Sequence, residues 1–195
     1  MPLDLATVPP ANPVAEHVVQ LVGSGPDTGD LALHKVFFTA INHAAKRIWL
    51  TTPYFVPDDA LLTALLTAAL RGVDVRVLVP KKGDSRMVDL AARSYFPELL
   101  EAKVRIFEYE PRFIHAKTLL CDDDVSIVGT ANFDNRSFRL NFELCILFED
   151  AGVAGALEAV LARDFERSRQ VVVGRPLAFR SRLAEALARL LSPLL

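Results

Sequence analysis

RIWLTTPYFVPDDALLTALLTAALRGVDVRVLVP, residues 47–80, is the stretch that decides the fold. Arg47–Phe55 is mostly apolar and aromatic, which is typical of a β-strand. Residues 58–72 open with two aspartates, continue in leucine and alanine and end at a glycine, which is the pattern of a helix. Val73–Pro80 alternates apolar and polar residues and predicts a second strand. A strand, a helix and a strand in succession indicate an α/β fold.

The segments on either side of this unit continue the alternation. Further strands are expected at 18–25, 104–110 and 143–150, and helices at 30–46, 85–101, 153–170 and 177–191. We expect Asp30 to cap the first of these helices. The runs 115–121 and 125–131 flank three aspartates, a turn composition, and therefore predict a hairpin. The prediction is an α/β fold with a mixed β-sheet flanked by helices on both faces.

The two ends of the chain differ from its middle. Residues 1–16 are rich in proline and predict a linker or tail, followed by one domain over 17–195. That domain ends in a predicted amphipathic helix, 177–191, whose leucines gather on one side away from its arginines. Such a helix lies on an anionic membrane surface or packs on its own domain, and the sequence favours neither. No apolar run approaches the roughly 18 residues of a membrane span.

Composition narrows the function classes. Of the 195 residues, 51% are hydrophobic and 24% charged, the balance of an ordinary globular protein. The formal net charge of −2 argues against a protein that binds nucleic acid by neutralising many phosphates. Cys121 and Cys145 lie in apolar runs, which favours buried, reduced thiols over a disulfide. Neither a P-loop nor a dinucleotide-binding glycine motif is present.

The segment that carries chemistry is FIHAKTLLCDDDVSIVGTANFDNRSFRLNFE, residues 113–143. His115 and Lys117 are two apart, so in a strand both side chains leave the same face. Their neighbours are apolar, which predicts a buried strand and a lysine that needs a compensating anion. Taken singly, such a pair is usually a surface pair, the aspartates a solvated turn and Asn132 a turn residue. Together they favour a shared anion site, whereas adjacent hairpin carboxylates make a poor metal site.

This segment resembles the phospholipase D superfamily, whose signature is H-x-K-x4-D-x6-G-S/T-x-N. Every spacing is kept, by His115, Lys117, Asp122, Gly129, Thr130 and Asn132. Threonine replaces the commoner serine at position 130 and retains the hydroxyl. The flanking stretches, among them TTPYFVPDDALLTAL and GTANFDNRSFRLNFE, resemble the C-terminal half of bacterial cardiolipin synthases. The resemblance extends from about Val18 to the end of the chain and implies a phospholipase D-like fold with one motif.

The resemblance implies substitution at phosphorus through a covalent phosphohistidine. His115 would be the nucleophile, and Glu143 lies where the family places the carboxylate that fixes the tautomer of this histidine. Lys117 and Asn132 would bind the non-bridging phosphate oxygens. The charge of the lysine supports the transition state without a metal, so neither a metal nor another cofactor is expected.

Further residues are assigned weaker roles. Asp122 belongs to the motif, and at the far end of its strand it is expected to fix the hairpin rather than to touch substrate. Thr130 could add a hydroxyl donor. Tyr54 ends a strand at the edge where α/β proteins bind ligands, although an aromatic core residue is an equal reading. Lys81 and Lys82 follow a strand and form either a phosphate-facing cluster or a solvated loop.

The reaction needs two histidines, one to attack and one to protonate the departing alcohol. This chain has a single motif, because His17, His34 and His43 are followed by the wrong residues. Two chains must then pair as a homodimer through His115, or the chain is the C-terminal half of a longer protein that supplies the second motif.

Three functions follow from the resemblance. The first is phosphatidyl transfer, in which two molecules of phosphatidylglycerol give cardiolipin and glycerol. The second is hydrolysis of a phosphodiester in a lipid or a nucleic acid, and the third is a catalytically silent half-domain. The first implies a phospholipid substrate, no nucleic acid partner, and a peripheral position on the cytoplasmic side of the bacterial cell membrane. The acceptor alcohol and the acyl preference are not determined by the sequence.

Overall fold

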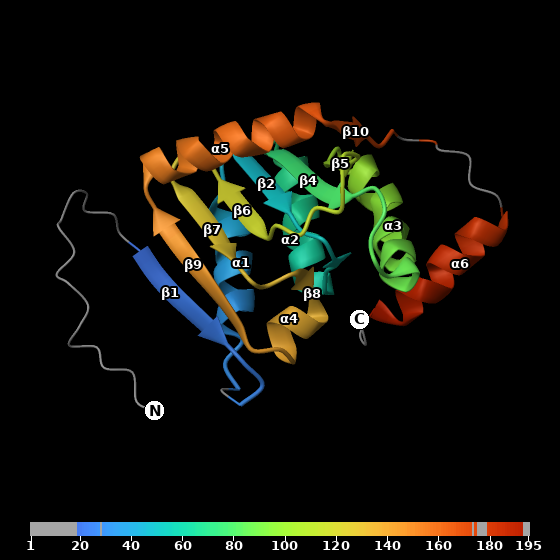
Figure 1. The fold of residues 1–195 in the computed structure, drawn as a ribbon, viewed down its shortest axis with the longest axis horizontal. Helices are drawn as coiled ribbons and strands as arrows, with labels where there is room; N and C mark the ends of the chain where they lie inside the picture. Colours follow the sequence, from blue (N-terminus) through green and yellow to red (C-terminus); the bar gives the residue numbers. More distant parts are fainter. Residues whose placement is uncertain (1–18, 28, 173, 175–178, 193–195) are drawn as a thin grey trace.

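The computed structural model describes residues 19–27, 29–172, 174 and 179–192 (Figure 1). The predicted linker 1–16, His17 and the first two residues of the predicted C-terminal helix lie outside them. The strands of the main sheet are β1 (Val19–Ser24), β2 (Arg47–Thr51), β4 (Asp74–Pro80), β5 (Arg105–Tyr109), β6 (Thr118–Cys121), β7 (Val125–Gly129), β9 (Glu143–Glu149) and β10 (Ser168–Gln170). The helices are α1 (Ala32–His43), α2 (Asp59–Leu70), α3 (Arg86–Glu101), α4 (Asn135–Arg139), α5 (Ala151–Glu166) and α6 (Phe179–Leu190).

Eight strands form the main sheet in the order β1-β9-β7-β6-β2-β4-β5-β10. Strands β2, β4 and β5 are consecutive in the sheet and run parallel, and all other neighbours in it are antiparallel. The predicted hairpin is β6–β7, with Cys121 opposite Val125. The prediction of a mixed sheet is therefore confirmed.

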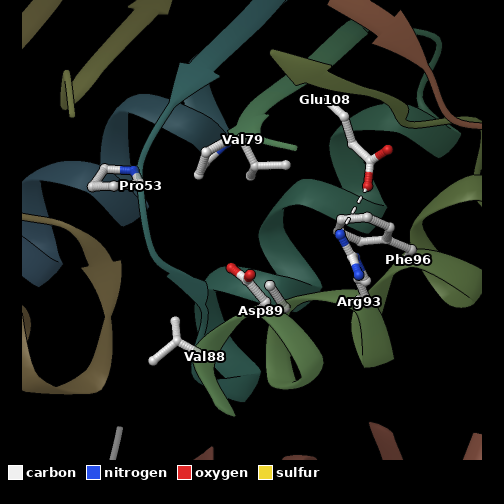
Figure 2. Close-up of a pocket in the computed structure, with 9 residues that line it drawn as sticks. Pro53, Val79, Val88, Asp89, Arg93, Phe96 and Glu108 are labelled. Atoms are coloured by element: carbon white, nitrogen blue, oxygen red, sulfur yellow. Dashed lines mark ion pairs between the residues drawn. The ribbon is translucent and has the colours of Figure 1, made fainter. Parts of the chain in front are cut away.

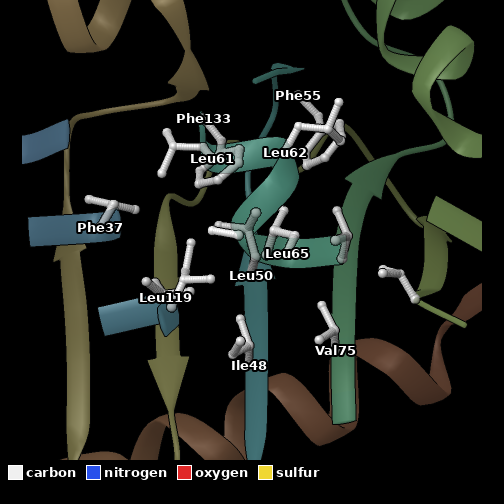
Figure 3. Packing of buried hydrophobic residues seen from close by; sticks show 14 of the residues in the cluster. Phe37, Ile48, Leu50, Phe55, Leu61, Leu62, Leu65, Val75, Leu119 and Phe133 are labelled. Atoms are coloured by element: carbon white, nitrogen blue, oxygen red, sulfur yellow. The ribbon is translucent and has the colours of Figure 1, made fainter. Parts of the chain in front are cut away.

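Helices cover both faces of this sheet, as predicted. Alternation along β2 directs Ile48 and Leu50 into the main core, against α1 and α2 (Figure 3). Trp49 points to the opposite face, where its ring meets Phe165 of α5 edge-on at 5.2 Å. Each such large side chain contributes roughly 1.5–3 kcal/mol when fully buried. Because both faces are covered, the central strands are apolar on both sides.

Both cysteines agree with the prediction of buried, reduced thiols. Cys121 in β6 and Cys145 in β9 are buried and form no disulfide. Burial raises the pKa of each thiol, which favours the neutral form.

Some predicted boundaries are wrong. The stretch Arg47–Phe55 is not one strand, since β2 ends at Thr51 and the chain resumes as β3 (Phe55–Val56) in a separate two-stranded sheet with β8 (Phe133–Asp134). Pro53 lies at the break and has no N–H to donate. This small parallel sheet brings the segment after β2 beside the segment after β7, which matters for the site.

Two helix predictions also need correction. Helix α1 begins at Ala32 after Leu31 and has no side-chain cap, whereas the Asp30 carboxylate pairs with Lys35 instead. The predicted helix 153–170 ends at Glu166, because the last residues form β10 and pair with β5. By contrast, α2 begins at the two aspartates where the sequence predicts a helix, and the Asp58 side chain caps it.

Helix α6 packs on α3, so its described part follows the second of the two alternatives left open above. The Arg189 guanidinium bonds to Glu98 at 2.8 Å and lies 4.3 Å from the centre of the Tyr95 ring. The outer side of the helix keeps exposed leucines, namely Leu183, Leu187 and Leu190. In the described part of the chain, no helix has both the length and the apolar character that a bilayer crossing requires.

Candidate functional site

His115 and Lys117 lie side by side at the entrance to β6. The strand begins only at Thr118, so the prediction that both residues belong to a buried strand is wrong. His115 is exposed and Lys117 half-buried. Their side chains nevertheless meet, with Lys117 Nζ 3.0 Å from His115 Nδ1 and 3.1 Å from Nε2. The ammonium also donates to the His115 carbonyl at 2.9 Å, which holds the two residues together.

The ammonium of Lys117 is partly buried, and the two nearby carboxylates only partly offset the effect of that burial on its pKa. Burial lowers the pKa of its ammonium below the ordinary value, although Glu143 and Asp134 act in the opposite direction. A partly desolvated cation next to an exposed imidazole is an arrangement that a bound anion would stabilise.

Aromatic rings flank the histidine. The Tyr54 ring stands edge-on to His115 with the centroids 6.4 Å apart, and Phe113 lies at 5.6 Å. The Tyr54 hydroxyl donates to Asp84 Oδ2 at 2.7 Å, and burial together with that bond raises its pKa to about 12. Tyr54 therefore stays a neutral phenol beside the imidazole.

The motif glycine is required by close packing at the end of β7. A Cβ on Gly129 would overlap the Leu144 carbonyl oxygen and lie 2.5 Å from Cys145 Sγ, so only glycine allows β9 to approach here. The chain then turns at Thr130, whose N–H donates to the Leu144 carbonyl at 3.0 Å. This turn places Asn132 next to the start of β8.

Glu143 is held by three polar side chains. Its carboxylate accepts from Thr130 Oγ1, from Ser137 Oγ at 3.0 Å and from Asn141 Nδ2 at 3.3 Å. No hydrogen bond of the described residues joins it to His115, so its predicted role in fixing the tautomer stays a prediction. The Thr130 hydroxyl donates its hydrogen bond to this carboxylate and is therefore not available to donate to a ligand.

Sequence reasoning missed Ser137 and Asp134. Ser137 is fully buried in α4, where its hydroxyl accepts from the Asn132 N–H at 3.0 Å and donates to Glu143. Asp134 caps α4 by accepting from the Ser137 N–H at 2.7 Å, and burial raises its pKa to about 6. A cap signal over 134–137 could have revealed the helix, but the contact with Glu143 depends on tertiary structure.

Asn132 has unused hydrogen-bonding capacity. Its Oδ1 is buried and has no partner among the described residues. Buried polar atoms of this kind are uncommon and call for a specific explanation, such as a bound ligand.

Asp122 lies at the opposite end of β6, on the order of 15 Å of strand away from Lys117. Its carboxylate accepts from the backbone N–H groups of Ala45, Lys46 and Arg47 at 2.7–3.1 Å. Burial alone would raise its pKa, but these donors hold the pKa below its usual value. The residue ties the hairpin to the segment between α1 and β2, as expected from the sequence.

The structure does not bring the two lysines of the 81–82 loop into this group. Lys81 Nζ pairs with Glu110 at 2.7 Å, and Lys82 is exposed. Neither lines a cavity described below, and their proposed contact with phosphate stays a prediction.

Described residues line at least two hollows. The larger has a volume of about 280 Å³ and is lined by Tyr54, Val56, Val88, Asn132, Asp134, Arg136 and Asn141. The smaller, between β4 and α3, holds the buried Glu108 with its ion-pair partner Arg93 (Figure 2). Its volume of about 10 Å³ admits no more than a water molecule. Of these two hollows, the larger has room for a substrate group.

The mixed sheet, the paired His115 and Lys117 and the turn carrying Asn132 define a phospholipase D-like domain. Nuc, a phospholipase D family member from Salmonella typhimurium, has the same fold, with a TM-score of 0.70 and 19% identity over 80% of this chain and 99% of its own. A phosphatidylserine synthase from Haemophilus influenzae matches with a TM-score of 0.71 and 17% identity over 91% of this chain and 48% of its own. At these identities the likeness establishes the fold alone.

Sequence comparison then specifies the family. The family model described as "Cardiolipin synthase, PLD-like domain" matches residues 37–167, and the chain belongs to that family. Cardiolipin synthase A from Pseudomonas putida (strain GB-1) is 44% identical over 96% of this chain, and cardiolipin synthase 2 from Bacillus anthracis is 47% identical over 91%. The aligned part is 40% of the first relative and 35% of the second, so the chain spans well under half of their length.

Proposed function

We propose that this domain transfers a phosphatidyl group between alcohols, using two molecules of phosphatidylglycerol to form cardiolipin and glycerol. The observation that carries the proposal is the Lys117 ammonium held 3.0 Å from an exposed His115 ring nitrogen. Relatives at 44–47% identity that are named cardiolipin synthases support the choice of lipid over other phosphodiesters.

His115 is the proposed nucleophile. In the first step a bond forms between a ring nitrogen of His115 and phosphorus while the bond from phosphorus to the glycerol oxygen breaks. Lys117 and Asn132 bind the non-bridging oxygens, on which negative charge builds up. An ammonium about 4 Å from a phosphate gains on the order of 4 kcal/mol in an effective dielectric of about 20, before desolvation. In the second step the hydroxyl oxygen of the second lipid forms a bond to phosphorus while the bond from phosphorus to His115 breaks.

The remaining motif residues act by positioning. Glu143 is proposed to stabilise the charge and tautomer of His115, and the bonds from Thr130 and Ser137 keep this carboxylate in place. Asp122 is proposed to fix the hairpin that delivers Lys117, because its carboxylate is occupied by backbone donors far from the phosphate.

A second motif must complete the site. A leaving alcohol needs a proton, and a second histidine is the group that supplies it and later removes one from the acceptor. We therefore propose that the domain pairs with another motif-bearing copy, either a second chain or a companion half of a longer protein. We also propose peripheral contact with the cytoplasmic side of the cell membrane, where phosphatidylglycerol is available.

The decisive experiment supplies labelled phosphatidylglycerol in vesicles and measures cardiolipin and free glycerol. His115→Ala should abolish both products, whereas His43→Ala, which removes an exposed histidine of α1, should leave them unchanged. Equal product from the wild-type chain and the His115→Ala variant would refute the catalytic assignment. Phosphatidic acid without cardiolipin would instead identify a hydrolase.

Pairing is tested by mixing. If two copies of this chain share one site, excess His115→Ala chain should suppress wild-type turnover by forming mixed pairs with one histidine. Light scattering on the same samples reports the oligomeric state, and activity from a strict monomer would contradict the two-histidine argument.

A further inference from the structure

The 280 Å³ hollow beside the motif is built from residues that the reaction scheme above does not use, apart from Asn132. It lies between the segment after β2, the first turn of α3 and the loop around α4. Its volume is close to the roughly 300 Å³ at which ligand sites begin. Because the small β3–β8 sheet holds two of these walls together, the hollow is part of the fold rather than a gap between loops.

Its lining combines polar and apolar side chains. Asn132 and Asn141 offer amides that both donate and accept, Arg136 adds a guanidinium, and Asp134 adds a carboxyl group. Val56 and Val88 are apolar. This combination suits a small group with several hydroxyls next to an anion. It does not suit a quaternary ammonium headgroup, which is recognised by a cage of aromatic rings.

The hollow opens beside the nucleophile. Tyr54 lines it and also stands edge-on to His115, with 6.4 Å between ring centroids. Asn132 belongs to both the motif and the lining, and its buried Oδ1 has no partner among the described residues. A hydroxyl that entered the hollow could donate to this atom while staying attached to a phosphate bound at Lys117.

We propose that this hollow, lined by Tyr54, Asn132, Arg136 and Asn141, binds the glycerol headgroup of phosphatidylglycerol and so selects the alcohol of the reaction. The inference rests on the proposed function. The headgroup that leaves in the first step and the headgroup that attacks in the second are both glycerol, and the second step reverses the first with another lipid. One subsite therefore serves both alcohols.

The bonds and protons balance in this scheme. In the first step the glycerol oxygen leaves phosphorus and takes a proton from the histidine of the second motif copy, as the bond from His115 to phosphorus forms. In the second step the acceptor's hydroxyl oxygen forms the new bond to phosphorus, its proton returns to that histidine, and the bond to His115 breaks. The hollow orients the diol and takes no part in the proton transfer.

Binding of water-soluble headgroups to the full chain tests the subsite without requiring turnover. Isothermal titration compares glycerophosphoethanol, a phosphodiester that carries one glycerol, with diethyl phosphate, which has the same charge and carries none. We expect the first to bind about tenfold or more tightly, since hydrogen bonds involving charged groups commonly give that factor. Arg136→Gln, which removes the guanidinium, and Val88→Phe, which fills the hollow, should abolish the preference. Arg139→Gln is the matched control, because it changes an arginine of the same helix that does not line the hollow.

The outcomes separate the two proposals. Equal binding of the two probes by the wild-type chain overturns the subsite, and so does a preference that survives in both Arg136→Gln and Val88→Phe with the fold intact by circular dichroism. A preference that is lost only in those two variants supports it. Lipid turnover is measured in parallel with phosphatidylglycerol and phosphatidylethanol. If the binding preference holds but neither lipid reacts in a chain that light scattering shows to be paired, the transferase proposal fails while the subsite stands.

Discussion

Both ends of strand β6 carry residues of the one motif, but the polar groups at the two ends differ in how far they are satisfied. At its entrance His115 is exposed and Lys117 is partly desolvated, and the nearby Asn132 has an unpartnered buried oxygen. At its exit the Asp122 carboxylate accepts hydrogen bonds from three backbone N–H groups, which occupy it structurally. A buried polar atom without a partner beside an exposed histidine suits a bound ligand, whereas a carboxylate filled by backbone donors suits a structural role. The motif thus combines a reaction site with the fastening that positions it.

The largest effect is expected from the entrance. Lys117→Met should lower phosphatidyl transfer by about 10²–10³-fold, because one charged donor to the developing phosphate charge is lost. Lys46→Met is the matched control at the other end, where the lysine pairs with Asp123, and it should retain activity. Initial rates with phosphatidylglycerol vesicles measure both. Similar losses in the two variants would remove the distinction between the ends.

The lowered pKa of Lys117 predicts that phosphatidyl transfer depends on pH. Burial lowers the pKa of Lys117, so its charged form is lost at lower pH than in an ordinary lysine. Activity should therefore fall with rising pH before the usual lysine value of 10.5 is reached. A rate profile that stays flat up to that value would show that the ammonium is not needed.

At the exit the expected change is in stability. Asp122→Ala should lower the free energy of unfolding by about 2–4 kcal/mol, since three N–H groups lose their acceptor and an alanine is strained at the observed φ of +53°. Asp122→Asn keeps an acceptor oxygen and tolerates this backbone conformation, so it should lose less. Urea unfolding measures both variants. A variant that unfolds normally yet loses transfer activity per folded molecule would place Asp122 in the chemistry.

The smallest effect is expected on the pH dependence of the free energy of unfolding, through the buried Asp134. Its folded pKa of about 6 lies above the unfolded value, so the stabilisation is complete below about pH 3.8 and is lost as pH rises through 6. Asp134→Asn keeps the helix cap but does not ionise. Relative to wild type it should gain up to about 3 kcal/mol of unfolding free energy at pH 8 and little at pH 3.5. Equal differences at both pH values, measured by urea unfolding, would contradict the assigned burial effect.

Much of the fold could be predicted because its signals are local. The strand–helix–strand unit at 47–80 and the aspartate turn at 122–124 are readable from periodicity and composition. The errors lie where tertiary pairing overrides local preference. Residues 168–170 follow a helical pattern but add to β5 as a strand, and Phe55–Val56 pairs with a segment almost eighty residues away.

The chain's own residues determined the chemistry on offer: an imidazole, an ammonium and an amide at fixed spacing around one hairpin. Only the tertiary structure decided which of them face a ligand. Burial and hydrogen bonding depend on neighbours distant in sequence. The Asp122 carboxylate therefore accepts hydrogen bonds from the segment between α1 and β2. The Glu143 carboxylate accepts from the side chains of Thr130, Ser137 and Asn141. The hollow beside His115 has the same origin, because its walls come from parts of the chain that meet only when the sheet and α3 are assembled.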